Sequence, residues 1–503
     1  MRSATLGDLE QAVVRVFGVL VCAAIVLPTL PLLGPLAGAI AALLGAATAW
    51  RIWRWVPESV SGGLRRRPVL VVLWTVAALL ALVQIGRLAA FTADPDRRWG
   101  SAVPDPAAAN HACLSAYFVA AELSRRDVVN LYDERYYPAF AGDAARLLAP
   151  GSVQGLASWI DDPFEYPPPF LLFPRAALLV SNDFPSLRAG WFVLQALALV
   201  LVGGWLARWV GGRDGELAFL LLPVLLASLP TLLGLQFGQF HVATLLLSVA
   251  ALICFEERRT GTGAALLAMA TVSKLFPAFL LVFLLARRRW REVGWTLVAC
   301  GVFALVGLGA LGWNPFQAFL TYQLPRISTG EAFAFYEKAP EFIISRNFGI
   351  PGLTTKLQLL GVPGMTRGLG SVLGWIYTLG LLAIAWVGGL RPASRLGDAR
   401  IWLGLLSLAA LRSPLAPSAY VTISTLWLLT LLAGEVRGRP ARVVAFVVAW
   451  VVIMGPPPLE GPPELAVGFL GQAIGIAVCL WAVLGPRPGT ASLPESALAP
   501  GGA

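Results

Sequence analysis

The sequence is short of charge, of lysine and of histidine. Charged residues make up 13% of its 503 residues and hydrophobic residues 57%, and the mean hydropathy is +0.73. About a quarter of the residues of a soluble globular domain are charged, so this composition excludes that class. The net charge of +10 comes from arginines in short clusters between apolar runs. That pattern argues against a nucleic-acid partner and is typical of membrane topology signals.

Cysteines are also scarce. Of Cys22, Cys113, Cys254, Cys300 and Cys479, only Cys113 lies outside an apolar run. No disulfide framework and no cysteine spacing typical of a metal site is present, so the sequence marks no metal-site residue and identifies no certain cofactor. A clean signal peptide is lacking too, because acidic residues precede the first apolar run and no small-residue cleavage site follows it. We therefore expect that run to be a retained helix.

What the sequence has in abundance is long apolar runs. A run of about 20 apolar residues is long enough to span a bilayer. The candidate helices are 12–31, 34–50, 69–91, 189–207, 216–235, 237–255, 263–273, 275–287, 293–312, 367–390, 399–412, 419–433, 441–455 and 466–485. We predict an all-α integral membrane protein with a bundle of about 13–14 transmembrane helices.

The arginines predict the topology, because short cytoplasmic loops are rich in basic residues. The basic clusters are Arg51/Arg54/Arg65–Arg67, Arg208/Arg213, Arg258/Arg259, Arg287–Arg289 with Arg291, Arg391/Arg395/Arg400 and Arg437/Arg439/Arg442. All of them fall on one side if both termini are cytoplasmic in a bacterial inner membrane. Two large loops, 92–166 and 313–366, then lie on the outer face.

Two segments need special treatment in this scheme. Residues 169–181 are apolar but too few for a comfortable span, so we expect a re-entrant half-helix that starts at the outer face. Lys274 and Pro277 interrupt the run 263–286, and a lysine in mid-membrane is costly. We expect two short helices there, with Ser273 to Pro277 at their outer tip.

The expected domains follow from this topology. Residues 1–68 form a helical hairpin and a basic loop, 69–433 the membrane core, 434–485 a second hairpin, and 486–503 a disordered cytoplasmic tail. The first outer loop holds eight aspartates and three glutamates, 11 of the 28 carboxylates of the chain. It also contains a predicted amphipathic helix, 113–126.

Several short motifs occur in order along the predicted outer face. They are Tyr117-x-x-Ala120, Leu131-Tyr132-Asp133, Phe164-Glu165-Tyr166-Pro167-Pro168-Pro169-Phe170, Gly238-Gln239-Phe240-His241, Ser273-Lys274-Leu275-Phe276-Pro277 with Arg287-Arg288-Arg289-Trp290, Asn347-Phe348-Gly349, and Leu411-Arg412-Ser413-Pro414 through Tyr420. This series resembles the polyprenol-phosphate-sugar-dependent glycosyltransferases of family 87, which are membrane enzymes of the GT-C superfold.

The resemblance implies transfer of a mannose-like sugar from a polyprenyl-phosphate donor to a lipid or glycan acceptor on the outer face. Such a site needs a base for the acceptor hydroxyl and positive charge for the phosphate leaving group. The substrate-binding candidates that it implies are Lys274, Gln239, His241, Tyr166, Glu165, Asn347, Arg346 and Arg412. The expected partners are the donor, the acceptor and membrane lipids, with no nucleic acid.

Each candidate also has a structural interpretation. Lys274 either binds the phosphate or extends its ammonium to the interface, and His241 is either functional or a packed polar residue at a helix start. Gln239 either caps a helix or binds sugar hydroxyls. Tyr166 begins a proline run that favours a rigid turn. Arg346 and Arg412 bind either a substrate phosphate or a lipid headgroup.

The catalytic base is the part of the resemblance that does not match. The family has an aspartate four residues before the tyrosine of Tyr117-x-x-Ala120, and Cys113 stands there. A neutral thiol accepts hydrogen bonds poorly, so we expect another base. Our candidates are Asp105 first, then His111, whose side-chain type titrates near neutral pH, with Asp96 and Asp94 behind them. Asp105 stands between two prolines, where aspartate also commonly shapes a turn.

Two other functions fit an apolar chain of this kind. A lipid or glycan transporter or flippase would usually show repeated halves with broken helices, and no internal repeat is visible. A catalytically degenerate membrane protein of the same fold is the other alternative, and it gains weight from Cys113.

Overall fold

The computed structural model describes residues 6–56, 68–103, 109, 111–126, 128–137, 153–156, 163–436, 440–455, 459 and 461–485. Within this part of the chain the regular structure is helical, with two isolated β-bridges and no strand. The prediction of an all-α membrane protein is confirmed. The basic loop around Arg65–Arg67, Asp105 and the tail 486–503 lie outside the described residues.

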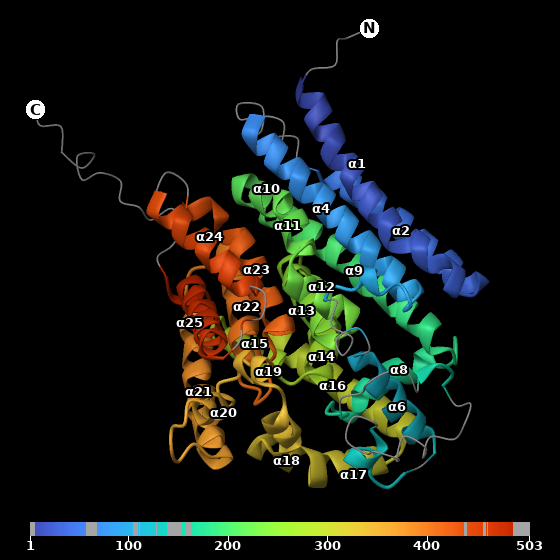
Figure 1. The fold of residues 1–503 in the computed structure, drawn as a ribbon, viewed down its shortest axis with the longest axis vertical. Coiled ribbons are helices and arrows are strands. Elements are labelled where there is room, and N and C mark those ends of the chain that lie inside the picture. The colour runs from blue at the N-terminus through green and yellow to red at the C-terminus, as the bar shows by residue number, and fades with distance from the viewer. Residues whose placement is uncertain are drawn as a thin grey trace, which may run out of the picture.

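The helices are distributed along the whole chain (Figure 1). In chain order they are α1 (Leu6–Val26), α2 (Pro35–Trp55), α4 (Pro68–Ala93), α6 (Cys113–Arg125), α8 (Leu172–Ala177), α9 (Phe184–Val210), α10 (Gly212–Leu220), α11 (Leu222–Leu226), α12 (Leu229–Gln236), α13 (Phe240–Glu256), α14 (Thr260–Ser273), α15 (Phe279–Ala286), α16 (Trp290–Leu311), α17 (Asn314–Ala318), α18 (Leu324–Thr329), α19 (Glu341–Ser345), α20 (Leu353–Leu359), α21 (Arg367–Gly389), α22 (Arg395–Ala410), α23 (Ser418–Leu432), α24 (Pro440–Met454) and α25 (Pro462–Leu484).

By length and composition, eight helices of the described part can cross a membrane, or nine if α12 and α13 form one broken span. Three more apolar helices, α14, α24 and the segment 276–286, are shorter. The N-terminal helices α1, α2 and α4 pack together along one edge of the bundle against α9, and α22 to α25 form the opposite side (Figure 1). The short helices α6, α8, α17 and α18 gather at one end of the bundle, opposite α10.

The predicted single helix 216–235 is wrong. The segment forms α10, α11 and α12, because Pro223 and Pro230 each begin a new helix in the first turn, where proline is tolerated. After α12 the chain turns by 111° into α13. Gly238 makes this bend at φ +64°, and a Cβ there would lie 3.0 Å from the Cβ of Leu114. The bend brings Gln239 to the N-terminus of α13.

The predicted pair of short helices at 263–286 is confirmed. α14 ends at Ser273, a turn follows, and α15 ends at Ala286. The two ends of this segment meet, because Arg289 pairs with Glu256 and donates to the carbonyl of Phe255 at 3.1 Å. The segment is therefore a hairpin, and Lys274 lies at its far tip.

The short helix predicted at 169–181 is present in the structure. It consists of the 3-10 turn Pro168–Leu171 and α8. Ten helical residues reach about 15 Å, half the thickness of the hydrocarbon core. The segment packs against α6 and α16, and the Cα of Pro169 lies 3.4 Å from the position of a Cβ at Gly307. It therefore supports the end of the bundle where α6 and the end of α16 lie.

The predicted helix 113–126 forms as α6, but it is buried on nearly every side rather than lying on a surface. All of its residues from Cys113 to Ser124 are buried. The half-helix, α12 and the aromatic residues after Phe164 cover it. Full burial excludes water around the first residues of this helix, which matters for the site below.

Three of the arginine clusters, those around Arg208, Arg287 and Arg395, meet at one end of the bundle. Arg287 pairs with Asp398, Arg400 pairs with Glu435, and Arg395 donates to the carbonyl of Trp209 at 3.2 Å. Loops that are more than 100 residues apart in sequence therefore meet there. Lys274 lies at the opposite end of α14.

We predict that the end with the arginines is cytoplasmic. In a background without native cysteines, Val362→Cys should react with a membrane-impermeant maleimide in intact spheroplasts, and Arg291→Cys only after permeabilisation. Both positions are exposed, so accessibility within the protein does not limit either reaction. Labelling of Arg291→Cys in intact cells would reverse the topology.

Candidate active site

Gln239 is the centre of a polar cluster beside α6. Its Oε1 accepts hydrogen bonds from the hydroxyls of Tyr117 at 2.9 Å and Tyr166 at 2.7 Å. These two hydroxyls lie 2.7 Å apart, and the backbone N–H of Phe240 donates to Tyr117 at 3.2 Å. Three motifs that are far apart in sequence therefore meet at one amide. Gln239 makes no side-chain cap to its helix, so capping does not explain its position.

Cys113 and His111 extend the cluster at the N-terminus of α6. The Nε2 of Gln239 donates to the Sγ of Cys113 at 3.5 Å, and the Nε2 of His111 lies 3.3 Å from the same sulfur. The imidazole of His111 packs edge-on against Phe237, with ring centroids 4.8 Å apart. Cys113 is buried, whereas His111 is partly exposed. His111 is therefore the member of this pair that a substrate can reach.

Aromatic rings enclose the tyrosine hydroxyls. Tyr166 stacks on Phe170 at 4.6 Å between centroids, and Trp191 stacks on Phe240 at 5.6 Å. Trp191 also donates to the carbonyl of Gly238 at 2.8 Å, which fixes the bend before Gln239. Burial, with the neighbouring Tyr117, raises the pKa of Tyr166 well above its usual value. The phenol stays protonated and serves as a hydrogen-bond donor rather than as a base.

Lys274 reaches the same cluster from the tip of the α14–α15 hairpin. Its Nζ lies 5.1 Å from the ring centroid of Tyr166. His241 is buried and stacks on Phe276 with centroids 5.0 Å apart. Lys274 therefore adds a positive charge over the Tyr166 ring. His241 packs against Phe276, two residues after Lys274 in the hairpin.

Asn347 and Arg346 hold the scaffold next to this cluster. Asn347 is fully buried; its Nδ2 donates to the carbonyl of Pro414 at 2.8 Å, and its Oδ1 accepts from Gly349 and Ala416. Arg346 pairs with buried Glu464 of α25 through two nitrogens. The hydrogen bonds of Asn347 join the loops 347–349 and 413–417, which carry two of the sequence motifs. The ion pair with Glu464 neutralises the charge of Arg346.

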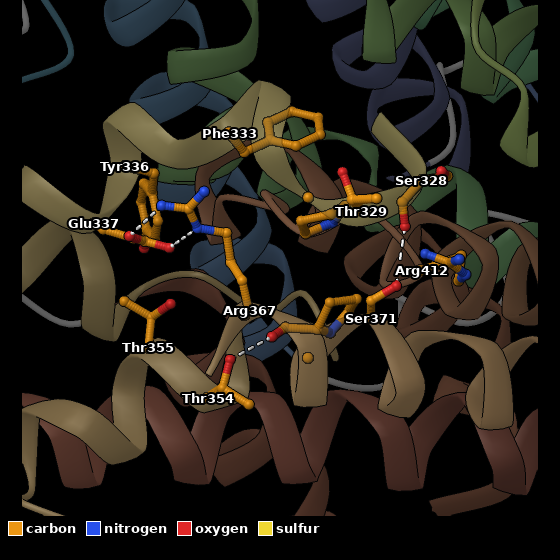
Figure 2. A pocket seen from close by; sticks show the side chains of 15 residues that line it. Ser328, Thr329, Phe333, Tyr336, Glu337, Thr354, Thr355, Arg367, Ser371 and Arg412 are labelled. Atoms are coloured by element: carbon orange, nitrogen blue, oxygen red, sulfur yellow. Dashed lines mark hydrogen bonds and ion pairs between the residues drawn. The ribbon is translucent and has the colours of Figure 1, made fainter. Parts of the chain in front are cut away.

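Arg412 lines a separate small pocket of about 30 Å³, surrounded by hydroxyl groups (Figure 2). Its Nε donates to Thr378 at 2.6 Å, and its guanidinium lies 5.2 Å from the ring centroid of Trp375. Figure 2 shows Arg412 on the side of Ser328 and Ser371, with the ion pair of Arg367 and Glu337 on the other side. Arg412 is thus a half-buried cation that ion-pairs with no described carboxylate.

The carboxylate candidates are scattered. Asp94 accepts from Arg97 at 3.1 Å just after α4, and Asp96 is exposed in the same turn. Glu165 is partly buried beside Tyr166. Asp105 lies outside the described residues. Ala102, three residues before it, donates its backbone N–H to the Oε1 of Gln236 at 2.6 Å, and Gln236 stands three residues before Gln239. Of the four candidates for the base, His111 is the one that the described structure brings into the cluster.

Sequence reasoning did not include Tyr117 and Cys113 among the site residues. The signal for Tyr117 was available, because Tyr117-x-x-Ala120 is one of the motifs in the ordered series. Cys113 stands where the family has an acid, and its contact with His111 is local in sequence, whereas its hydrogen bond with Gln239 joins residues 126 positions apart. Among the described residues, no group of three His, Cys, Asp or Glu side chains could hold a metal ion.

We predict a modest effect for Tyr166→Phe. The variant removes one hydrogen bond to Gln239, which is worth about 0.5–1.5 kcal/mol, so any activity that depends on this cluster should fall by roughly two- to tenfold. Tyr377→Phe is the matched control, because its hydroxyl bonds only a helix carbonyl, that of Leu408, at 2.8 Å. Steady-state transfer rates of both variants test this. Equal losses would assign the Tyr166 hydroxyl to stability alone.

Comparison with known proteins supplies one match. The model of the family described as glycosyltransferase family 87 matches residues 164–414, about half of the chain. The match begins in the segment of Tyr166 and ends just after Arg412, and it includes Gln239 and Lys274. No curated protein and no solved structure matches the chain.

Proposed function

Because this chain belongs to glycosyltransferase family 87, we propose that it transfers a mannose-like hexose from a polyprenyl-phosphate donor to a lipid or glycan acceptor. The reaction takes place at the outer face of a bacterial inner membrane, with both termini in the cytoplasm. One observation carries this proposal: Tyr117, Tyr166 and Gln239 form a buried hydrogen-bonding centre, and Lys274 lies 5.1 Å from the Tyr166 ring.

Lys274 binds the phosphate of the donor. An ammonium beside a cluster that excludes water attracts an anion more strongly than one in bulk water does. The same charge stabilises the phosphate as it leaves the anomeric carbon. The neighbouring apolar walls of Phe170, Phe173 and Trp191 suit the first isoprene units of the lipid.

Gln239 and the two tyrosines orient the sugar. Gln239 offers an amide with both donor and acceptor atoms, and each phenol can donate one hydrogen bond. Hydroxyl groups of a hexose can replace the bonds that these three side chains make to one another. A sugar held in this way presents its anomeric carbon near the phosphate bound by Lys274, which favours reaction by positioning.

The transfer needs one proton acceptor. The acceptor hydroxyl loses its proton to a base as its oxygen attacks the anomeric carbon, the bond from that carbon to the phosphate oxygen breaks, and the phosphate leaves with the bond electrons. A single displacement inverts the configuration and requires no protein nucleophile. We retain Asp105 and His111 as the first candidates for this base. The contacts that link His111 through Cys113 to Gln239 support His111.

The decisive experiment is donor use. Purified protein in detergent should consume a radiolabelled polyprenyl-phosphate hexose and release polyprenyl phosphate, and Lys274→Ala should do so much more slowly. If the protein instead moves the labelled lipid across proteoliposomes without cleaving it, it is a flippase. If neither activity occurs with mannose, glucose or arabinose donors, the catalytic proposal fails.

A further inference from the structure

A second cavity lies at the other end of the bundle, where the arginines gather. Its volume is about 600 Å³, far larger than the pocket beside Arg412. It lies between the α13–α14 turn, the α15–α16 turn and the start of α22. Arg258, Arg287, Arg289 and Arg291 line it, and Phe255 and Phe283 add apolar walls. The proposed reaction takes place at the opposite end and uses none of these residues.

Four arginines line the cavity against three carboxylates, which leaves an excess of one positive charge. Arg287 pairs with Asp398, and Arg289 pairs with Glu256 and, at 3.1 Å, with Glu292. These three carboxylates line the cavity, and each of them pairs with Arg287 or Arg289. Arg258 and Arg291 are exposed and ion-pair with no described residue. The Nε of Arg287 is buried without a hydrogen-bond partner in the described structure. The cavity therefore keeps an excess of N–H donors and positive charge.

Two helix N-termini add to this positive potential. α14 and α16 begin beside the cavity, and their N-cap residues, Arg259 and Arg289, make no side-chain cap. The first backbone N–H groups of these helices are therefore left for other acceptors, and the helix dipoles point their positive ends the same way. Thr260, the first residue of α14, itself lines the cavity.

The backbone of the two turns is strained where the arginines stand. Arg258 has φ 61° and Arg288 has φ 57°, a region that glycine adopts far more easily than a residue with a side chain. Glycine would relieve both turns, and it is abundant elsewhere in the chain. Strain of this kind is retained where the side chain has a role, and Arg258 lines the cavity.

The cavity also lies beside a lipid-facing helix. Only 17% of the apolar stretch of α16 is buried in the bundle, and Trp290 at its first position is 64% exposed. Tryptophan at a helix end is typical of the headgroup level of a membrane. A lipid beside α16 can therefore place its headgroup in the cavity without leaving the bilayer.

We propose that this cavity binds a phosphate group, that of an anionic phospholipid headgroup or a free phosphate, through Arg258, Arg291 and the N-termini of α14 and α16. Charge-assisted bonds from arginine are well suited to phosphate oxygens, and the volume admits a complete headgroup. The site does not depend on the proposed sugar transfer.

The test is lipid binding to the purified full-length chain. Native mass spectrometry would measure the affinity for phosphatidylglycerol and phosphatidylcholine in wild type and in the double variant Arg258→Gln, Arg291→Gln. We expect wild type to prefer phosphatidylglycerol and the double variant to bind it roughly thirtyfold more weakly, the loss expected for two arginines near a membrane surface. Both positions are exposed at turns, so the variants should fold, which a thermal melt in detergent checks.

The control is Arg213→Gln, Arg442→Gln, which removes the same charge from exposed residues outside the cavity. Equal weakening in both double variants, or none in either, would overturn the site. A loss of binding that is confined to the cavity variant supports the site. Competition with inorganic phosphate then shows whether the ligand is a lipid headgroup or a free phosphate. If inorganic phosphate at millimolar concentration displaces phosphatidylglycerol from wild type, the ligand is free phosphate; if it does not, the ligand is the lipid headgroup.

Discussion

Turnover should fall by roughly 10²–10⁴-fold when the catalytic base is removed, while donor binding changes little. We expect this result from Asp105→Asn or from His111→Ala. Lipid-sugar binding depends on the phosphate and the sugar, neither of which touches the base in the ground state, whereas proton transfer occurs only in the transition state. Single-turnover rates with saturating donor, together with donor affinities, separate the two effects.

His111 has the stronger structural support of the two. It is partly exposed, it contacts the sulfur of Cys113, and that sulfur bonds to Gln239 at the centre of the cluster. Asp133→Asn is the matched control, because Asp133 lies in the same outer loop and pairs with Arg135 at 2.5 Å. Arg135 lowers the pKa of Asp133 through their hydrogen bond, so this carboxylate is ionised and already paired with Arg135.

Full turnover in both Asp105→Asn and His111→Ala would remove both residues from consideration. Asp94→Asn and Asp96→Asn would then be tested in the same assay. If no carboxylate in residues 92–166 matters and His111 does not either, the chain does not catalyse the proposed transfer.

Lys274→Ala should weaken donor use by one to two orders of magnitude. A charge-assisted contact to phosphate is worth about 1.5–3 kcal/mol, and the loss should appear both in donor affinity and in the rate of phosphate departure. Lys274→Arg keeps the charge and should recover a large part of the activity. The measurement is the dependence of initial rate on donor concentration.

Arg98→Ala provides the comparison for Lys274. Arg98 is an exposed cation in the turn after α4, so its removal lowers the positive charge of the protein without changing the cluster. Its kinetics should equal those of wild type. If Lys274→Ala also leaves donor use unchanged, its ammonium only reaches the interface and binds no phosphate.

The sequence alone determined the class of the protein and most of its helices. Apolar length and the positions of proline are local properties, and they set where α4, α9, α16, α21 and α25 run. Because a charge in mid-membrane is costly, the sequence predicted two short helices in 263–286, separated at Lys274, and the structure has them. The prediction failed at 216–235, because a proline in an apolar run can be tolerated in the first turn of a helix, and the run alone does not show that Pro223 and Pro230 each begin a new one.

Only the tertiary structure decided which polar residues act together. The bond from Cys113 to Gln239 joins residues 126 positions apart, and the ion pair of Arg346 with Glu464 spans 118. Lys356, which no motif marks, is fully buried, bonds to Gln472 at 3.0 Å, and has its pKa lowered to about 7 by burial. Hydrophobic periodicity specifies which face of each helix is buried, but not which partner it meets. Charge neutralisation and desolvation depend on that partner. The sequence could therefore suggest the motifs, but only packing brought Tyr117, Tyr166 and Gln239 together beside Lys274.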